Sequence, residues 1–254
     1  MVCYWVRDGL PDMAGRQQAS SQPQPHLHPP EPMTRHETGS LFPATRFPDR
    51  FARELHELFL WRRDVRKFRL DPAPVSLIHD LLCDAATMSP SVGLSQPSRF
   101  VYVETKQARY AALQNFEAAN ERALLGYLGE QKQLYASLKL SGMREAPVQI
   151  AAFCADETEQ GCGLGAATMP ETLSYSVVCA IMQFWLATRA AGLGLGWVSI
   201  LEPEALKNSL GVDAGWSLIG YLCVGWPDEE SLNPELERAG WERRRHGDDH
   251  ITRV

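Results

Sequence analysis

The chain has 254 residues, of which 22% are charged and 44% hydrophobic, and its formal net charge is −6. This composition is that of an ordinary globular protein with one large or two small domains. The negative charge argues against a nucleic-acid-binding surface and against a polybasic membrane anchor, so we expect neither kind of partner.

Cysteine and histidine usage excludes two further classes. The six cysteines form no Cys-x-x-Cys pair, so no disulfide framework is indicated and a reducing cytoplasm is the expected location. No histidine occurs between residues 80 and 245. A Ser-His-Asp triad or a His-rich catalytic metal site is therefore disfavoured, and we expect no metal.

Residues 1–45 differ from the rest of the chain. The segment 17–32 is rich in Ser, Gln, Pro and His. Such a composition buries too little apolar surface to offset its ordering entropy, and it contains no apolar run typical of a secretory signal. The sequence predicts a disordered extension over 1–45 and a globular domain over 46–254.

The domain alternates helical and strand patterns. Apolar residues recur at helical spacing over 51–59, and again over 75–82 after Pro74. Three apolar runs are typical of buried strands, at 100–103, 148–153 and 218–224. Residues 106–139 predict a long helix whose apolar face comprises Leu124, Leu125, Leu128, Leu134 and Leu138. The pattern indicates an α+β or mixed α/β domain.

A nearly all-apolar segment, 173–190, follows Thr168-Met169-Pro170-Glu171, which has the capping-box pattern. The segment contains too many polar groups for a membrane span. We expect a helix buried on every side, which in a chain of this size often marks a subunit interface. The run Gly-Leu-Gly-Leu-Gly at 192–196 comes after this helix and before a strand. That order is the reverse of a dinucleotide-binding turn, so we interpret the run as a helix stop and a close-packing turn.

Arg62, Arg63 and Arg66 lie just after the first helical pattern, with a single carboxylate, Asp64, among them. A loop of Ser, Pro and Gly at 89–97 follows the next helical pattern. Guanidinium groups bind phosphate oxygens in pairs, and a Ser/Gly loop can offer backbone N–H groups to an anion. The two segments together predict a site for a phosphorylated cofactor.

Each feature also has a simpler explanation. An acid beside arginines is often a surface ion pair worth about 0–1 kcal/mol. Arginines at the end of a helix complement its dipole. Ser199 could be an ordinary strand serine. Spacing alone leaves these alternatives open.

Five segments, in order along the chain, resemble the flavin-dependent nitroreductase superfamily. They are Arg-Arg-Asp-Val-Arg-x-Phe at 62–68, Ser-Pro-Ser-Val-Gly-x-x-Gln-Pro at 89–97, Arg-Glu-Ala-Pro-Val-Gln at 144–149, Thr-Met-Pro-Glu-Thr at 168–172 and Gly-x-Gly-Trp-Val-Ser-Ile-Leu at 194–201. Ordinary nitroreductases and flavin dehalogenases typically carry serine at the third position of the first motif. The branch of 5,6-dimethylbenzimidazole synthases carries aspartate, as this chain does at Asp64, and pairs it with a serine that matches Ser199.

The resemblance implies a nitroreductase-like fold, with a central, mostly antiparallel sheet flanked by helices. It further implies a domain-exchanged homodimer with two sites for flavin mononucleotide (FMN) at the subunit interface. The residues implied in flavin binding are Arg62, Arg63, Asp64, Val65, Arg66, Ser89, Pro90, Ser91 and Ser199. Residues 115–141 would form a lid over the ring. One of Arg238, Arg243, Arg244 and Arg245 would join the phosphate site, and the sequence leaves open which.

The implied reaction is the O₂-dependent fragmentation of reduced FMN to 5,6-dimethylbenzimidazole and erythrose 4-phosphate, for the lower ligand of cobalamin. Asp64 would act as general acid/base and Ser199 would hydrogen-bond the ring. NAD(P)H would act only indirectly, through a separate flavin reductase. Two alternatives stay open, an NAD(P)H-dependent FMN nitroreductase or quinone reductase and a non-catalytic flavin-binding protein.

Overall fold

The computed structural model describes residues 47–254. The extension predicted over 1–45 lies outside these residues. Within them, the structure contains a four-stranded sheet of order β1-β2-β4-β3, in which every neighbouring pair is antiparallel. The strands are β1 (Ser98–Tyr102), β2 (Val148–Ala155), β3 (Gly194–Val198) and β4 (Trp216–Gly225). The predicted fold class and the three predicted strands are confirmed.

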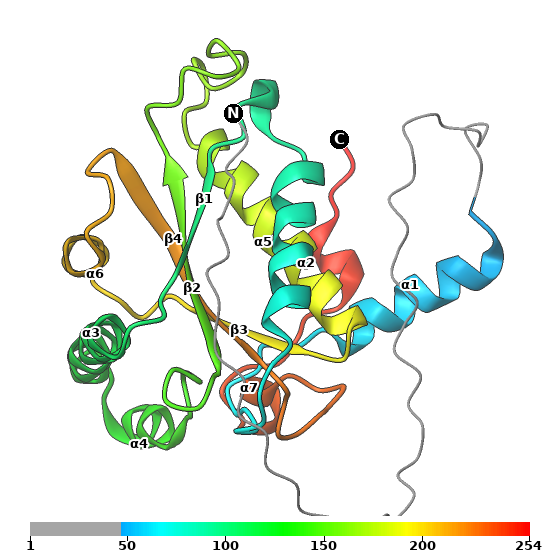
Figure 1. Ribbon diagram of the computed structural model, residues 1–254. Coiled ribbons are helices and arrows are strands. Elements are labelled where there is room, and N and C mark those ends of the chain that lie inside the picture. The colour runs from blue at the N-terminus through cyan, green and yellow to red at the C-terminus, as the bar shows by residue number, and fades with distance from the viewer. Residues whose placement is uncertain (1–46) are drawn as a thin grey trace, which may run out of the picture. The chain divides into compact units, whose positions relative to one another are not determined.

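Helices cover both faces of the sheet (Figure 1). α5 (Thr172–Ala190) lies along one face and packs against α2 (Val75–Met88). α3 (Lys106–Leu125) and α6 (Pro203–Leu210) lie together on the other face. β2 and β4 are the central strands, and helices cover both of their faces. For this reason β2 and most of β4 are continuous apolar runs and not alternating ones.

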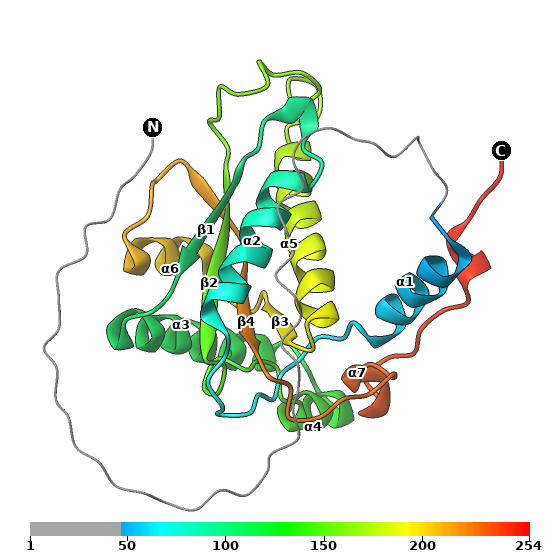
Figure 2. The same ribbon diagram turned by 45° about the vertical axis from the view of Figure 1, so that its right-hand side comes forward.

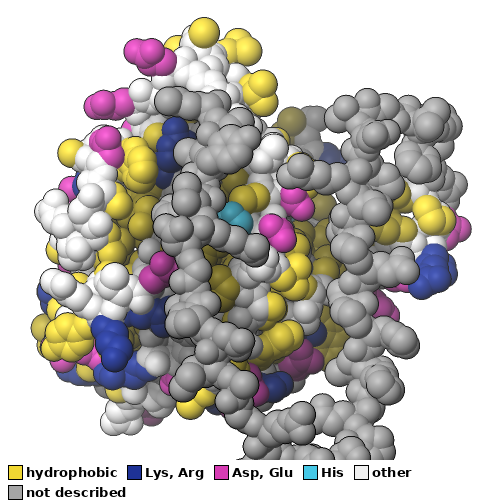
Figure 3. Space-filling view, in the orientation of Figure 1, with side chains coloured by type: hydrophobic (Ala, Val, Ile, Leu, Met, Phe, Trp, Pro, Cys, Tyr) yellow, Lys and Arg dark blue, Asp and Glu magenta, His cyan; other side chains and the backbone are white. Residues whose placement is uncertain are grey.

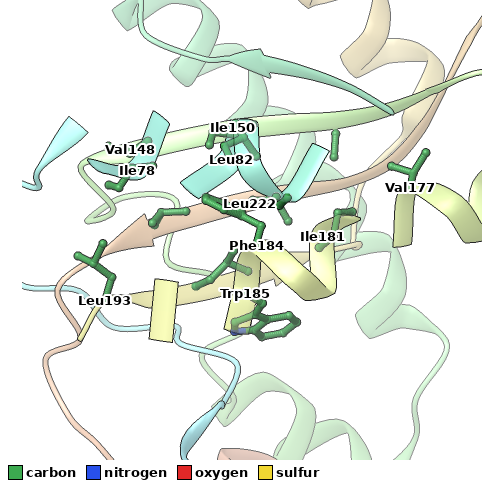
Figure 4. Close-up of a cluster of buried hydrophobic side chains, with 14 of the residues drawn as sticks. Ile78, Leu82, Val148, Ile150, Val177, Ile181, Phe184, Trp185, Leu193 and Leu222 are labelled. Carbon is green, nitrogen blue, oxygen red and sulfur yellow. The ribbon is translucent and has the colours of Figure 1, made fainter. Parts of the chain in front are cut away.

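Alternate residues of β2 enter two separate cores, because successive side chains of a strand point to opposite faces. Ile150 joins Phe184 of α5 in the core beneath α2 and α5 (Figure 4). Its neighbour Ala151, and Phe153 two positions further on, join the core beneath α3 and α6, together with Tyr221. Tyr221 is fully buried and donates a hydrogen bond to Gln149 Oε1 at 2.6 Å, so the phenol is satisfied inside the core.

The remaining elements lie outside these layers. α1 (Asp49–Trp61) has no buried residue and projects away from the sheet in both ribbon views (Figures 1 and 2). Its C-terminal end at Trp61 agrees with the predicted helix end. The other short elements are η1 (Val92–Leu94), α4 (Gly129–Ser137), α7 (Glu235–Arg238) and η2 (Gly247–His250).

The single long helix predicted over 106–139 is wrong. The structure has α3 and α4, separated at 126–128, with Gly129 at a positive φ of 56°. The predicted leucine face is also wrong, because Leu125 is 72% exposed and Leu128 is 82% exposed. Smaller side chains and one phenylalanine form the buried face of α3, namely Ala112, Phe116 and Ala119.

Two expectations for α5 also need correction. The helix begins at Thr172, and Glu171 makes no side-chain cap, so the capping box predicted at 168–171 is not formed. The helix is buried on one side only in the single chain, since Tyr175 and Met182 are 54% and 39% exposed. Its predicted end is confirmed, because Gly192 follows it with φ 78°. Among the described residues, no helix is long and apolar enough to cross a membrane.

Candidate functional site

The segment after α1 adds itself to the free edge of the sheet. Val65 donates its backbone N–H to Leu195 O at 3.0 Å, and Asp64 forms a parallel bridge with Leu195 in β3. The side chain of Asp64 completes the pairing, because Oδ1 accepts the backbone N–H of Trp197 at 2.9 Å. The motif 62–66 is therefore fixed to β3 by main-chain and side-chain bonds together.

Two glycines of β3 make this close approach possible. A Cβ added to Gly196 would lie 2.1 Å from the Val65 carbonyl oxygen, and one added to Gly194 would lie 2.8 Å from a methyl carbon of Val65. No side chain fits either position without displacing the segment. The prediction that this glycine run serves close packing is confirmed, and its partner is the arginine segment.

Asp64 forms a second contact through its other oxygen. Arg66 Nε donates to Asp64 Oδ2 at 2.7 Å, and the Arg66 side chain is only 13% exposed. Arg66 also donates to the Lys139 carbonyl oxygen at 3.2 Å, directly after α4. Arg66 therefore orients the carboxylate and ties it to the segment predicted as a lid.

Within residues 47–254, neither Arg62 nor Arg63 forms an ion pair with a carboxylate, although the charge of Glu237 acts on Arg63. The Arg62 guanidinium lies over the Trp185 ring, 4.9 Å from its centroid, and makes no hydrogen bond within the described residues. Arg63 donates to the Leu232 carbonyl oxygen at 2.7 Å. Burial, followed by the neighbouring charges of Arg62 and Arg244, lowers the pKa of Arg63 from its usual value. Three guanidinium groups thus repel one another here, and an anion would relieve that repulsion.

Two C-terminal arginines lie near this cluster. Arg238 lines a pocket together with Arg63 and Arg66, and Arg244 lies near Arg63. Arg244 Nε donates to Glu237 Oε2 at 3.1 Å, and its Nη2 donates to Asn233 Oδ1 at 3.3 Å. Neither its position nor that of Trp185 was specified by the sequence. The arginines of the C-terminal run carry no local pattern that distinguishes Arg244 from its neighbours.

The loop containing Ser89, Pro90 and Ser91 follows α2 and lies against the start of α5. Val92 donates its backbone N–H to Ser176 Oγ at 3.0 Å. Ser91 Oγ accepts the backbone N–H of Gln96 at 3.2 Å, which closes the loop.

Within one chain the two predicted halves of the site lie apart. The loop touches α5 at Ser176, whereas Arg62 stacks on Trp185, nine residues further along the same helix. At about 1.5 Å per residue this separation is about 14 Å along the helix axis. Figure 2 shows the same arrangement, with the segment after α2 at one end of α5 and the segment after α1 at the other.

Ser199 lies just beyond the end of β3 and is exposed. Its hydroxyl makes no hydrogen bond among the described residues, so the structure shows no direct contact with Asp64. The two residues are related through β3, because Asp64 binds the backbone of Trp197, two positions before Ser199. Residues 47–254 contain no cluster of His, Cys, Asp or Glu that could hold a metal ion.

The family model described as the nitroreductase family matches residues 59–226, which include the arginine segment, the loop after α2 and all four strands. The chain belongs to the nitroreductase family.

Curated relatives within the family are similar over most of their length. A protein named 5,6-dimethylbenzimidazole synthase from Rhodospirillum rubrum is 50% identical over 208 residues, which cover 82% of this chain and 96% of that protein. A protein of the same name from Rhodobacter capsulatus is 44% identical and covers 74% of this chain and 90% of its own.

Solved structures share the fold at low identity. An iodotyrosine deiodinase bound to FMN and 3-iodo-L-tyrosine aligns with a TM-score of 0.61 at 21% identity, over 78% of this chain and 97% of that one. A BluB-like flavoprotein from Clostridium difficile 630 aligns with a TM-score of 0.59 at 15% identity, over 79% of this chain and 98% of that one. These likenesses confirm the nitroreductase-like fold.

The crossing at β3 predicts a strong effect of one methyl group. Gly196→Ala would force its Cβ against the Val65 carbonyl oxygen and cost about 3 kcal/mol or more of unfolding free energy, the upper range for overpacking. The matched control is Gly247→Ala, because a Cβ at Gly247 meets nothing within 4 Å. Urea denaturation of both variants measures the difference, and equal stability would contradict the described crossing.

Proposed function

We propose that this protein is a 5,6-dimethylbenzimidazole synthase that fragments reduced FMN with O₂. The observation that carries the proposal is the Asp64 carboxylate, fixed by Trp197 N–H and by Arg66 beside the arginine cluster formed by Arg62, Arg63 and Arg244. The relatives that share most of the chain and carry this name support it. Erythrose 4-phosphate and the pyrimidine part of the ring would be the remaining fragments.

The arginine cluster fits the phosphate of FMN. Within residues 47–254, Arg62 and Arg63 form no ion pair with a carboxylate, and together with Arg244 they offer N–H groups that would bind a phosphate bidentately. We assign Arg66 a different part of the task, because it is occupied by Asp64 and the Lys139 carbonyl. Arg66 would hold the carboxylate toward the flavin while Val65 would contact the ring from the strand edge.

Asp64 would act as the general acid/base. Cleavage of the bonds between the ring and the ribityl chain requires protons to be moved near the ring nitrogens and the first ribityl carbon. A positioned carboxylate typically contributes about 10²–10⁴-fold to such a step. The exposed Ser199 hydroxyl, which makes no hydrogen bond within residues 47–254, would hydrogen-bond the ring or an oxygen added to it.

A homodimer would bring the two halves of the site together. Apolar side chains remain exposed along one face of α5, at Tyr175, Val178 and Met182, and α1 buries none of its residues. Figure 3 shows further hydrophobic side chains at the surface over α2, where Val75 and Met88 are exposed. If two α5 helices pack antiparallel about a two-fold axis, the end of each lies beside the start of the other.

That packing would set one subunit's Ser89–Ser91 loop opposite the arginine segment of its partner. The loop would line the ribityl side of the flavin, and the arginines would bind the phosphate. Each site would then require both subunits, and the separation of about 14 Å along α5 within one chain supports this arrangement.

The α3–α4 region would cover the flavin. Residues 115–141 include the exposed Leu125 and Leu128, and also Lys139, whose carbonyl oxygen binds Arg66. Closure of this region would exclude water from the reacting ring, which suppresses side reactions.

Supply of the substrate would require a separate flavin reductase that uses NAD(P)H. The described cysteines are all free thiols, which suits the reducing cytoplasm, where we place the reaction. Burial raises the pKa of the Cys154 thiol to about 12, so this cysteine stays protonated at cytoplasmic pH.

The direct test is aerobic incubation with FMN, NADH and an unrelated flavin reductase, followed by chromatography with mass detection. Dimethylbenzimidazole should appear in proportion to the flavin lost. Intact flavin, with NADH consumed by the protein itself and a nitroaromatic acceptor, would instead support the nitroreductase alternative. Tight flavin binding without any turnover would support a flavin-binding protein.

The assigned role of Asp64 predicts a loss of rate rather than of binding. Asp64→Asn should retain the hydrogen bond from Trp197 N–H and lower the fragmentation rate by about 10²–10⁴-fold. The matched control is Asp71→Asn, which alters an exposed Asp–Arg pair away from the site. Single-turnover fragmentation rates, measured at saturating reduced FMN, test this prediction. Wild-type rates in Asp64→Asn, with normal FMN binding, would remove Asp64 from the chemistry.

The two-subunit site predicts that dimerisation and flavin binding fail together. Met182→Asp places a charge on the exposed apolar face of α5 and should yield monomers that bind FMN at least about tenfold more weakly, since an unpaired buried charge costs several kcal/mol at an interface. Tyr110→Asp is the control, on the exposed surface of α3. Sedimentation and flavin fluorescence titration measure the two properties. Monomers with unchanged FMN affinity would contradict the prediction.

A further inference from the structure

Three aromatic side chains join the C-terminal segment to the predicted lid. Tyr127 and Tyr135 stack with ring centroids 4.7 Å apart. Trp241 packs edge-on against both, at 5.4 Å from Tyr127 and 6.0 Å from Tyr135. We call these three residues the aromatic clip.

The clip holds the start and the middle of α4. Tyr127 lies in the turn between α3 and α4, and Tyr135 lies in α4 itself. Tyr135 is 6% exposed, and its hydroxyl donates to Asn120 Oδ1 of α3 at 2.7 Å. Movement of Trp241 would therefore disturb the packing of both lid helices.

The aromatic clip is also connected, through the C-terminal segment, to the cluster formed by Arg62, Arg63 and Arg244. Trp241 donates its backbone N–H to the Leu236 carbonyl oxygen at 2.9 Å, which fixes it to α7. Arg244 follows three residues later and bonds back to Glu237 of the same helix at 3.1 Å. Trp241 and Arg244 thus belong to one folded segment. Arg244 lies near Arg63, because Arg63 binds the Leu232 carbonyl oxygen and Arg244 binds the side chain of the next residue, Asn233.

The C-terminal end of α4 is connected to Asp64 by a different set of contacts. The Lys139 carbonyl oxygen accepts Arg66 Nη1 at 3.2 Å, and Arg66 Nε holds Asp64. α4 is consequently held at one end by the segment that carries Arg244 and at the other by the arginine that orients the carboxylate.

We propose that Trp241 is a positioning residue that transmits phosphate binding at Arg63 and Arg244 to closure of α4 over the flavin ring. The inference rests on the proposed function, which it extends to substrate choice. A flavin with a phosphate fixes Arg244, and Trp241 then holds the lid. Riboflavin lacks the phosphate, so it leaves the clip without this restraint.

A loosely held lid has a specific chemical consequence. Reduced flavin exposed to water and O₂ transfers two electrons and two protons to O₂, and the products are oxidised flavin and hydrogen peroxide. This reaction competes with fragmentation. When the folded enzyme is in excess, so that all the reduced flavin is bound before O₂ is added, the ratio of dimethylbenzimidazole formed to reduced flavin consumed measures this competition for each turnover.

The experiment measures this ratio for Trp241→Ala, Trp241→Phe and the wild-type protein, each with reduced FMN and with reduced riboflavin. With reduced FMN, Trp241→Ala should lower the ratio about tenfold, equivalent to about 1.4 kcal/mol, and hydrogen peroxide should rise accordingly. Trp241→Phe should keep most of the wild-type ratio. Tyr110→Ala removes an exposed aromatic ring from α3 and should change nothing.

Reduced riboflavin separates coupling from simple structural damage. The wild-type protein should already show the low ratio with riboflavin, and Trp241→Ala should lower it less than about twofold further. A wild-type ratio in Trp241→Ala with reduced FMN would overturn the inference. An equal fall with both flavins would overturn it as well, because Trp241 would then act on the lid without reference to phosphate.

Hydrogen exchange tests the coupling between phosphate binding and the lid independently of the proposed function. Oxidised FMN should slow amide exchange in residues 126–137 of the wild-type protein more than riboflavin does, and Trp241→Ala should abolish that difference. If the wild-type protein makes no dimethylbenzimidazole but this pattern is present, the proposed function fails and the coupling is supported. If the two flavins protect 126–137 equally in the wild-type protein, the coupling fails.

Discussion

The structure depends on the crossing of residues 62–66 over the edge of β3. Backbone pairing at Val65 and the hydrogen bond from Trp197 N–H to Asp64 fix the segment, and the bare backbone of Gly194 and Gly196 makes room for it. This one short contact therefore determines three features of the structure. It closes an otherwise open sheet edge, it aims the arginines toward Trp185 and the C-terminal segment, and it fixes the carboxylate.

α5 sets the distance between the two halves of the proposed flavin site. Its buried face, with Phe184 and Ile181, anchors it to the sheet, so the helix cannot shift to bring its ends together. The loop contacts α5 at Ser176 and Arg62 contacts it at Trp185, and these two positions are about 14 Å apart along the helix axis. A second copy of the chain is the economical way to complete the site, and the exposed apolar face of the same helix is where that copy would pack.

The fold was largely predictable because its determinants are local. Apolar runs identified β1, β2 and β4, and the glycine at the end of α5 stopped the helix as expected. The glycine run of β3 was read correctly as a close approach, but its partner is distant in sequence and only the folded chain reveals it. The arginines and Asp64 were identified from their motif, and the bonds that hold them were not.

The sequence-based predictions were wrong where side-chain exposure or tertiary packing overrides the local sequence pattern. Leu125 and Leu128 suggested a buried helical face, yet they lie beside the break between α3 and α4 and are exposed. Gly126 and Gly129 marked that break in the sequence. The capping box at Thr168 failed because the chain makes tight turns over 161–171 before the helix begins at Thr172. Arg244 could not be singled out, since its place depends on α7 and on Glu237.

A mixed dimer tests most directly whether each site takes its arginines from one subunit and its Ser-Pro-Ser loop from the other. One subunit would carry Arg62→Ala and Arg63→Ala, and the other Pro90→Trp at an exposed loop position. Each homodimer should be inactive in the fragmentation assay. The co-expressed heterodimer should regain roughly half the wild-type rate, because two-fold symmetry leaves one of its sites without any substitution. No activity in the purified heterodimer would show that each site is built within a single chain.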